Sequence, residues 1–159
     1  MKHIINLDFS NVPYNWAVCF NNNCPLAEDC LRHHVAQILP NNTERTTCIT
    51  PLALQDGKCQ WFASCEPVTT AWGLNRLYDK VYHKDYAPLK KRIATALRGR
   101  SNYYRYNNGE LTLTPEEQQQ IANIMAEMGY NEPPVFEHYR KELQFDYIPQ
   151  QSTEINNKY

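Results

Sequence analysis

The stretch Cys19-Phe-Asn-Asn-Asn-Cys24-Pro-Leu-Ala-Glu-Asp-Cys30 opens a cysteine-rich region in a chain of 159 residues. All six cysteines lie between residues 19 and 65: Cys19, Cys24, Cys30, Cys48, Cys59 and Cys65. The N-terminal residues form no apolar run long enough for a signal peptide, so we expect a cytoplasmic protein. In a reducing compartment, clustered cysteines are more often ligands of a metal or cluster than disulfide partners.

Short elements are expected around these cysteines. Pro25 suits the first position of a helix over residues 25–38, whose apolar stripe includes Val35. The β-branched run at residues 44–50 predicts a strand, and Asp56-Gly57 predicts a turn within the following loop.

The rest of the chain is mainly helical in pattern. Apolar residues at helical spacing predict helices over residues 69–82, 87–98 and 101–108, from Thr114 to Met128, and over 134–143. Thr114-Pro-Glu-Glu117 has the form of a capping box. Residues 145–148 read as extended. We therefore expect an α+β fold, mainly α with a small β component.

Three regions follow from this pattern. A cysteine-rich region at residues 1–67, with one helix and short strands, is expected to pack on a helical, helix-turn-helix-like region at 68–148. Residues 149–159 are polar and read as a flexible tail.

Local sequence selects four of the cysteines as metal ligands. Cys24 falls at the start of the predicted helix, where the helix dipole stabilises a thiolate. Cys19 and Cys24 flank an Asn-rich loop, and Cys59 follows a tight turn. Cys48 lies within the predicted strand and reads as a small buried hydrophobe. We predict that Zn²⁺ or an iron–sulfur cluster is bound by Cys19, Cys24, Cys30 and Cys59.

Two alternatives stay open for the cysteines. Their spacing matches neither the paired C-x2-C of zinc ribbons nor the plant ferredoxin pattern, so buried free thiols and disulfides also fit. His33 and His34 lie on the predicted helix 25–38, and we expect surface or boundary positions for them.

Charge is distributed unevenly along the chain. Residues 76–105 contain nine Lys or Arg and two acidic residues, a net charge of +7, whereas residues 106–159 have a net charge of −6. This asymmetry fits either two solvated helix faces or a basic strip that binds phosphates.

The segment 101–108 carries side chains suited to DNA. Arg pairs with guanine, Asn pairs with adenine, and Ser holds phosphate. The predicted nucleic-acid contacts are Arg100, Ser101, Asn102 and Arg105. Residues 101–128 resemble part of a Cro/repressor-type helix-turn-helix, although the turn before Ser101 is one residue short. A homodimer would span two half-sites. The alternative is that Tyr103 and Tyr106 are core aromatics.

A wider resemblance covers residues 9–148. It rests on Cys24-Pro25 to Arg32, on Cys59-Gln-Trp-Phe62, and on Tyr103 to Gln118. These segments resemble an uncharacterised domain-of-unknown-function family of Bacteroidales bacteria. The resemblance implies that the four predicted ligands match family cysteines, whereas Cys48 and Cys65 do not. It implies no activity.

Together these features favour a non-enzymatic regulator or adaptor. Its cysteine-rich part would bind a metal or cluster, and its helical part would contact DNA or a protein. No protease or transferase signature surrounds any cysteine, and no apolar run is long enough to span a membrane. The alternatives are a structural or protein-interaction domain with buried free cysteines, and an iron–sulfur redox protein.

Overall fold

The described residues, 4 and 7–145 of a computed structural model, form two compact units. The first unit contains the described residues up to Glu66 together with 143–145, and the second is Pro67–Glu142. The second unit is therefore inserted into the sequence of the first. The expected α+β class is confirmed. The predicted tail at 149–159 and most of the predicted extended segment at 145–148 lie outside the described residues.

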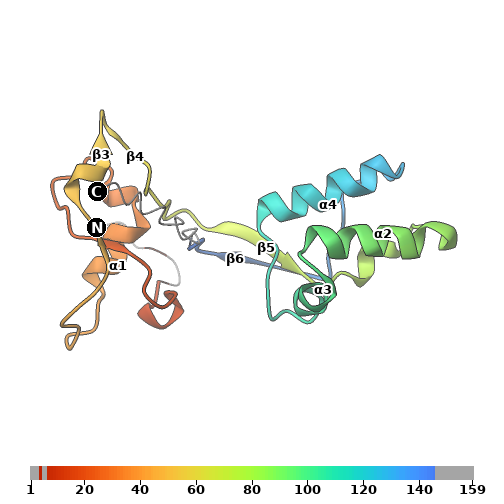
Figure 1. Cartoon of the computed structure of the whole chain (residues 1–159), viewed down its shortest axis with the longest axis horizontal. Helices are drawn as coiled ribbons and strands as arrows, with labels where there is room; N and C mark the ends of the chain where they lie inside the picture. Colours follow the sequence, from red (N-terminus) through yellow and green to blue (C-terminus); the bar gives the residue numbers. More distant parts are fainter. Residues whose placement is uncertain (1–3, 5–6, 146–159) are drawn as a thin grey trace, which may run out of the picture. The chain divides into compact units, whose positions relative to one another are not determined.

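The first unit is built from short elements. In chain order they are the 3₁₀ turn η1 (Phe9–Asn11), β1 (Val18–Cys19), η2 (Ala27–Asp29), α1 (Leu31–Gln37), β2 (Cys48–Ile49), η3 (Pro51–Ala53), β3 (Leu54–Gln55) and β4 (Lys58–Cys59). Strands β1 and β2 are parallel, with Val18 opposite Cys48. Strands β3 and β4 form a labelled hairpin in Figure 1.

The predicted helix at 25–38 was wrong at its start. Residues 27–29 form a 3₁₀ turn, and Cys30 is extended (φ −99°, ψ 114°) as the N-cap of α1. Tertiary pairing explains the break, because the backbone of Cys30 forms an antiparallel bridge with Ser64. The predicted strand at 44–50 is reduced to Cys48–Ile49. The Asp56-Gly57 turn is confirmed, and its φ angles of 51° and 72° match a tight hairpin turn.

A buried arginine stands at the centre of the first unit. Arg32 is 2% exposed; its Nε donates to the Trp61 carbonyl at 2.7 Å and its Nη1 to the Ala17 carbonyl at 2.7 Å. The guanidinium also lies 4.2 Å from the centroid of the Trp16 ring. One side chain on α1 thus joins the segment before β1 to the segment after β4.

Apolar packing completes this core. Its fully buried residues include Leu31 and Val35 of α1 and Val18 of β1. Phe145 packs edge-on against Trp16, with ring centroids 5.1 Å apart. The residues that follow the inserted unit are therefore part of the core of the first unit.

The second unit has longer elements. They are β5 (Val68–Trp72), η4 (Asn75–Tyr78), α2 (His83–Ala96), α3 (Arg100–Asn107), α4 (Pro115–Glu127) and β6 (His138–Glu142). Strands β5 and β6 are antiparallel, and α2 packs beside α4 (Figure 1). The apolar core lies among these helices and β5, and it includes Ala71, Leu74, Leu89, Ile93, Leu113, Ile121 and Phe136.

Two predicted helices in this unit were wrong. Residues 68–72 form a strand, as their β-branched residues favour, and Gly73 at φ 80° ends it. Residues 138–142 form a strand because they pair with β5 along its length. The helices predicted at 87–98, 101–108 and from Thr114 are confirmed as α2, α3 and α4 with shifted ends. The capping box between Thr114 and Glu117 is also confirmed.

Replacement of Arg32 by Ala should destabilise the first unit by about 3 kcal/mol, because two buried carbonyls lose donors that carry a charge. Denaturation followed by tryptophan fluorescence would report this loss, and circular dichroism would follow the helices of the second unit. Arg45→Ala, which removes an exposed arginine of the same unit, is the matched control and should change stability by less than about 0.5 kcal/mol. Equal effects of the two substitutions would contradict the central role of Arg32.

Candidate cysteine site and basic helical surface

Backbone hydrogen bonds fasten the segment after β4 beside the start of α1. The Leu31 N–H donates to the Ala63 carbonyl at 2.7 Å, and the Cys65 N–H donates to the Asp29 carbonyl at 3.1 Å. Arg32 holds the same two segments through the Trp61 carbonyl. The segment that follows Cys59 is thereby kept in the neighbourhood of Cys30.

The four predicted ligands lie in one electrostatic neighbourhood. Burial raises the pKa of the Cys19 thiol, and the neighbouring thiols raise it further. Those neighbours are Cys30, Cys24 and Cys59. All four side chains are partly exposed, and all four are free thiols. The choice of these four cysteines as metal ligands stays a prediction.

The two remaining cysteines differ from this group. Cys48 was expected to be buried, but its side chain is exposed, although its partner in the β1–β2 ladder, Val18, is buried. Cys65 is 4% exposed within the apolar core, with its Sγ 3.8 Å from the Glu28 carbonyl oxygen. All six cysteines are free, so the disulfide alternative finds no support.

The thiols do not form a finished coordination sphere. Among the described residues, no group of three or more His, Cys, Asp or Glu side chains is placed so that it could hold a metal ion. Cys24 was expected at a helix N-terminus, but it precedes the 3₁₀ turn η2, and Cys30 caps α1 instead. A helix-dipole effect on Cys24 is therefore not available.

The two histidines of α1 have different environments. His34 is 7% exposed and its Nε2 lies 2.7 Å from the Glu28 carbonyl oxygen, so the expected surface position was wrong for this residue. The Nδ1 of His33 is buried and has no hydrogen-bond partner among the described residues. Since His33 is three residues after Cys30, this atom is an unused polar group near the cysteine-bearing segment.

Helix α3 carries the predicted nucleic-acid contacts. Arg100, Ser101 and Arg105 are exposed, whereas Asn102 is half-buried. The Arg105 Nε lies 3.4 Å from the Glu110 Oε2, so this guanidinium already has a surface ion partner. Tyr103 is 3% exposed and Tyr106 packs against the same core, which confirms their structural role.

Helices α2 and α3 form a basic surface. Residues 83–107 contain seven Lys or Arg and one acidic residue, Asp85. The Tyr130 hydroxyl donates to Asp85 at 2.6 Å. Within the described residues, five of these basic side chains form no ion pair: Lys84, Lys90, Lys91, Arg98 and Arg100. Positive charge on this surface is thus left for an outside partner.

Sequence reasoning missed an aromatic cluster on this surface. Lys90 lies 5.7 Å from the Tyr86 ring centroid and 5.7 Å from that of Tyr104. The Arg100 guanidinium is also 5.7 Å from the Tyr104 centroid. The signal in the sequence is the i, i+4 spacing of Tyr86 with Lys90 and of Arg100 with Tyr104.

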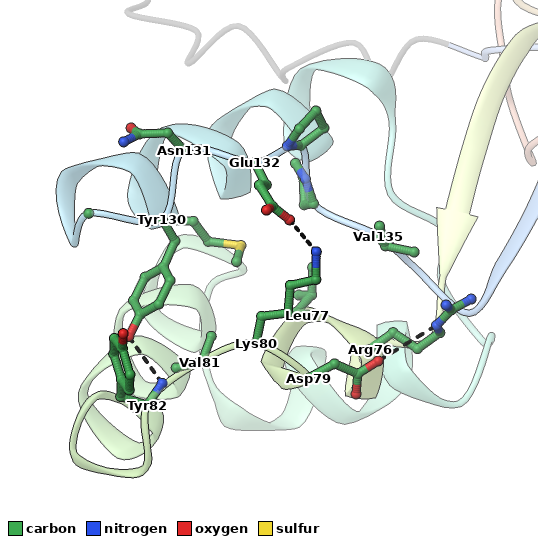
Figure 2. Close-up of a pocket in the computed structure, with 14 residues that line it drawn as sticks. Arg76, Leu77, Asp79, Lys80, Val81, Tyr82, Tyr130, Asn131, Glu132 and Val135 are labelled. Atoms are coloured by element: carbon green, nitrogen blue, oxygen red, sulfur yellow. Dashed lines mark hydrogen bonds and ion pairs between the residues drawn. The ribbon is translucent and has the colours of Figure 1, made fainter.

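A separate hollow of about 370 Å³ lies in the second unit (Figure 2). Figure 2 shows Lys80 reaching Glu132, with Nζ to Oε2 at 2.6 Å, and Tyr130 beside Tyr82. The Tyr130 hydroxyl accepts a hydrogen bond from the Tyr82 backbone N–H at 3.1 Å. The hollow contains none of the predicted site residues, and its charged lining residues are paired with one another.

Comparison with family models identifies the chain. The model of a family of unknown function, DUF6078, matches residues 1–145. The chain belongs to this family. The expected family of unknown function is thus confirmed, while the Bacteroidales source and the Cro/repressor resemblance stay predictions. Comparison with curated proteins and with solved structures gives no match. Membership in DUF6078 comes with no activity, so function must be argued from the residues.

The helices of this DUF6078 protein were also compared with the length of a membrane span. No helix among the described residues is both long enough and apolar enough to cross a bilayer.

Alkylation of the reduced, metal-free protein should distinguish the cysteines. Cys48 should react first with iodoacetamide, and Cys65 at least about tenfold more slowly because it is buried. Cys19 should react more slowly than Cys48, because its raised pKa lowers the thiolate fraction at neutral pH. Peptide mass spectrometry over a time course measures each rate. Equal rates at Cys19 and Cys48 would contradict this environment.

Proposed function

We propose that the first unit is a metal-binding module in which Cys19, Cys24, Cys30 and Cys59 hold one Zn²⁺ ion or one iron–sulfur cluster. The observation that carries the proposal is that Cys24, Cys30 and Cys59 lie close enough to the Cys19 thiol to raise its pKa, and that all four are free and partly exposed. Thiolates are preferred ligands for both kinds of centre.

The donor set fits such a centre in chemistry and in chain origin. Cys19 and Cys24 flank the loop at residues 20–23, Cys30 precedes α1, and Cys59 ends β4. Because the four ligands come from separate segments, a bound metal would add a further link between these segments. The buried Nδ1 of His33, three residues after Cys30, has no hydrogen-bond partner among the described residues.

Binding requires the thiols to move closer together. Each Zn–S bond is about 2.3 Å long, and among the described residues no three or more candidate ligands are placed so that they could hold a metal ion. Residues 20–23 include three asparagines and no regular secondary structure, so this loop is the part of the site best suited to adjust. The centre would then be structural, and it would rigidify the first unit of a non-enzymatic regulator or adaptor in a reducing cytoplasm.

Elemental analysis of anaerobically purified protein should find close to one Zn, or the iron and sulfide of one cluster, per chain. Visible absorbance separates a cluster, as in the redox alternative, from zinc. Serine in place of any of the four ligands should lower metal content and loosen the first unit, whereas Cys48→Ser, the matched control, should leave both unchanged. A metal content below about 0.2 per chain, together with normal folding after chelation, would refute the metal-binding proposal. The alternative, a structural or protein-interaction domain with free thiols, would then hold.

A second candidate function is favoured by the charge of α2 and α3. Residues 83–107 contain seven basic residues and one acidic residue, and five of the basic residues have no ion partner among the described residues. We propose that this surface binds nucleic acid, with Arg100, Ser101, Asn102 and Arg105 as contacts. A homodimer would double the number of phosphate contacts and tighten binding. A protein partner with an acidic surface is the alternative.

Affinity for nucleic acid should fall steeply with salt, because phosphate contacts release counterions. Arg105→Ala should weaken a specific DNA site by about 1–3 kcal/mol if the guanidinium contacts a base. Selection from genomic fragments followed by gel shifts measures both the salt dependence and the effect of Arg105→Ala. Arg140→Ala on β6 is the control, because it removes the same charge from a different element. Retention of no fragment at low salt would refute the nucleic-acid function and leave the acidic protein partner.

A further inference from the structure

Two exposed tyrosine rings and two cations form a continuous surface across α2 and α3. Tyr86 is 42% exposed and Tyr104 is 39% exposed. The Lys90 Nζ lies 5.7 Å from the centroid of each ring, and the Arg100 guanidinium lies 5.7 Å from the centroid of Tyr104. We call Tyr86, Lys90, Arg100 and Tyr104 the tyrosine platform.

Two further tyrosines support the platform from within. The Tyr78 ring centroid is 4.8 Å from that of Tyr86, and the Tyr103 centroid is 5.6 Å from that of Tyr104. The hydroxyls of Tyr78 and Tyr103 lie 3.0 Å apart in a hydrogen bond, and Tyr103 is 3% exposed. Since the inner rings are fixed, the outer rings lose little conformational freedom when a ligand stacks on them.

We propose that the tyrosine platform binds single-stranded nucleic acid by stacking bases on Tyr86 and Tyr104 while Lys90 and Arg100 contact the phosphates. This inference rests on the second candidate function, nucleic-acid binding by α2 and α3, and it specifies the substrate class. Paired bases in a duplex are stacked on one another, so their faces are not open to side chains. Unpaired bases offer those faces to aromatic rings, and the contact tolerates any sequence.

The charge around the platform fits a strand longer than two nucleotides. Lys84, Lys91 and Arg98 belong to the same two helices or the turn between them, and they form no ion pair in the described part of the chain. A polyanion with regularly spaced phosphates can neutralise several of these cations at once. An acidic protein surface would use the same charges, but it would gain nothing specific from two exposed rings.

Fluorescence anisotropy with the full chain tests the inference. The probes are labelled oligothymidine and oligouridine of about 20 nucleotides and a duplex of the same length. The single strands should bind more tightly than the duplex at low salt. Tyr104→Ala and Tyr86→Ala should each weaken oligothymidine binding by at least about fivefold, the low end for one stacked base. Tyr104→Phe keeps the ring and should bind within about twofold of the unchanged protein.

Two substitutions serve as matched controls. Tyr14→Ala removes a fully exposed ring from the first unit and should leave affinity unchanged. Lys141→Gln removes a β6 cation that forms no ion pair within the described residues, and it should weaken binding less than Lys90→Gln does. Circular dichroism checks that each variant keeps its helices.

The outcomes separate the two proposals. Duplex binding as tight as single-strand binding, with Tyr104→Ala unaffected, would overturn the platform and leave nucleic-acid binding by α3 standing. If polyglutamate displaces labelled oligothymidine as well as unlabelled oligothymidine does, and neither alanine variant changes affinity, the surface binds polyanions by charge alone. That result would overturn the platform. Failure of every probe to bind at low salt would overturn both.

Discussion

The first unit depends on one buried cation. Its two-residue strands and seven-residue helix supply few backbone hydrogen bonds, so the unit cannot be held together by secondary structure alone. Arg32 compensates by donating to carbonyls of two separate segments while its guanidinium covers the Trp16 ring. Burial of a charge raises the free energy of the folded state unless hydrogen-bond acceptors surround it, so the guanidinium requires these carbonyls at fixed positions. The cysteine-bearing segments take their places from this arrangement.

The turns around the cysteines could be predicted from sequence, because turn signals are local. The Asp56-Gly57 turn before Cys59 is an example, and its left-handed φ angles follow from the residue types. The start of α1 could not be predicted, since it is set by the bridge from Cys30 to Ser64, a partner 34 residues away in sequence.

The same contrast holds in the second unit. Helix α4 has its own cap and its own apolar stripe, and both can be read from the sequence. Strand β6 has neither, because its residues are polar and mostly exposed, and only pairing with β5 makes them a strand. The tyrosine platform is partly predictable from sequence. Its pairs within each helix are visible at i, i+4 spacing, but the meeting of the two helices around Lys90 requires the fold.

The antiparallel pairing of β5 with β6 places Val68 opposite Glu142, so the inserted unit begins and ends at neighbouring points of one ladder. The whole inserted unit is made before Phe145, whereas the core of the first unit is complete only when Phe145 covers Trp16. The first unit is therefore begun before the inserted unit and completed after it, and the synthesis of the inserted unit separates the two events. During that interval the six thiols are already outside the exit tunnel while their unit is incomplete, and this is the time at which a captured metal would do most to hold the chain in place.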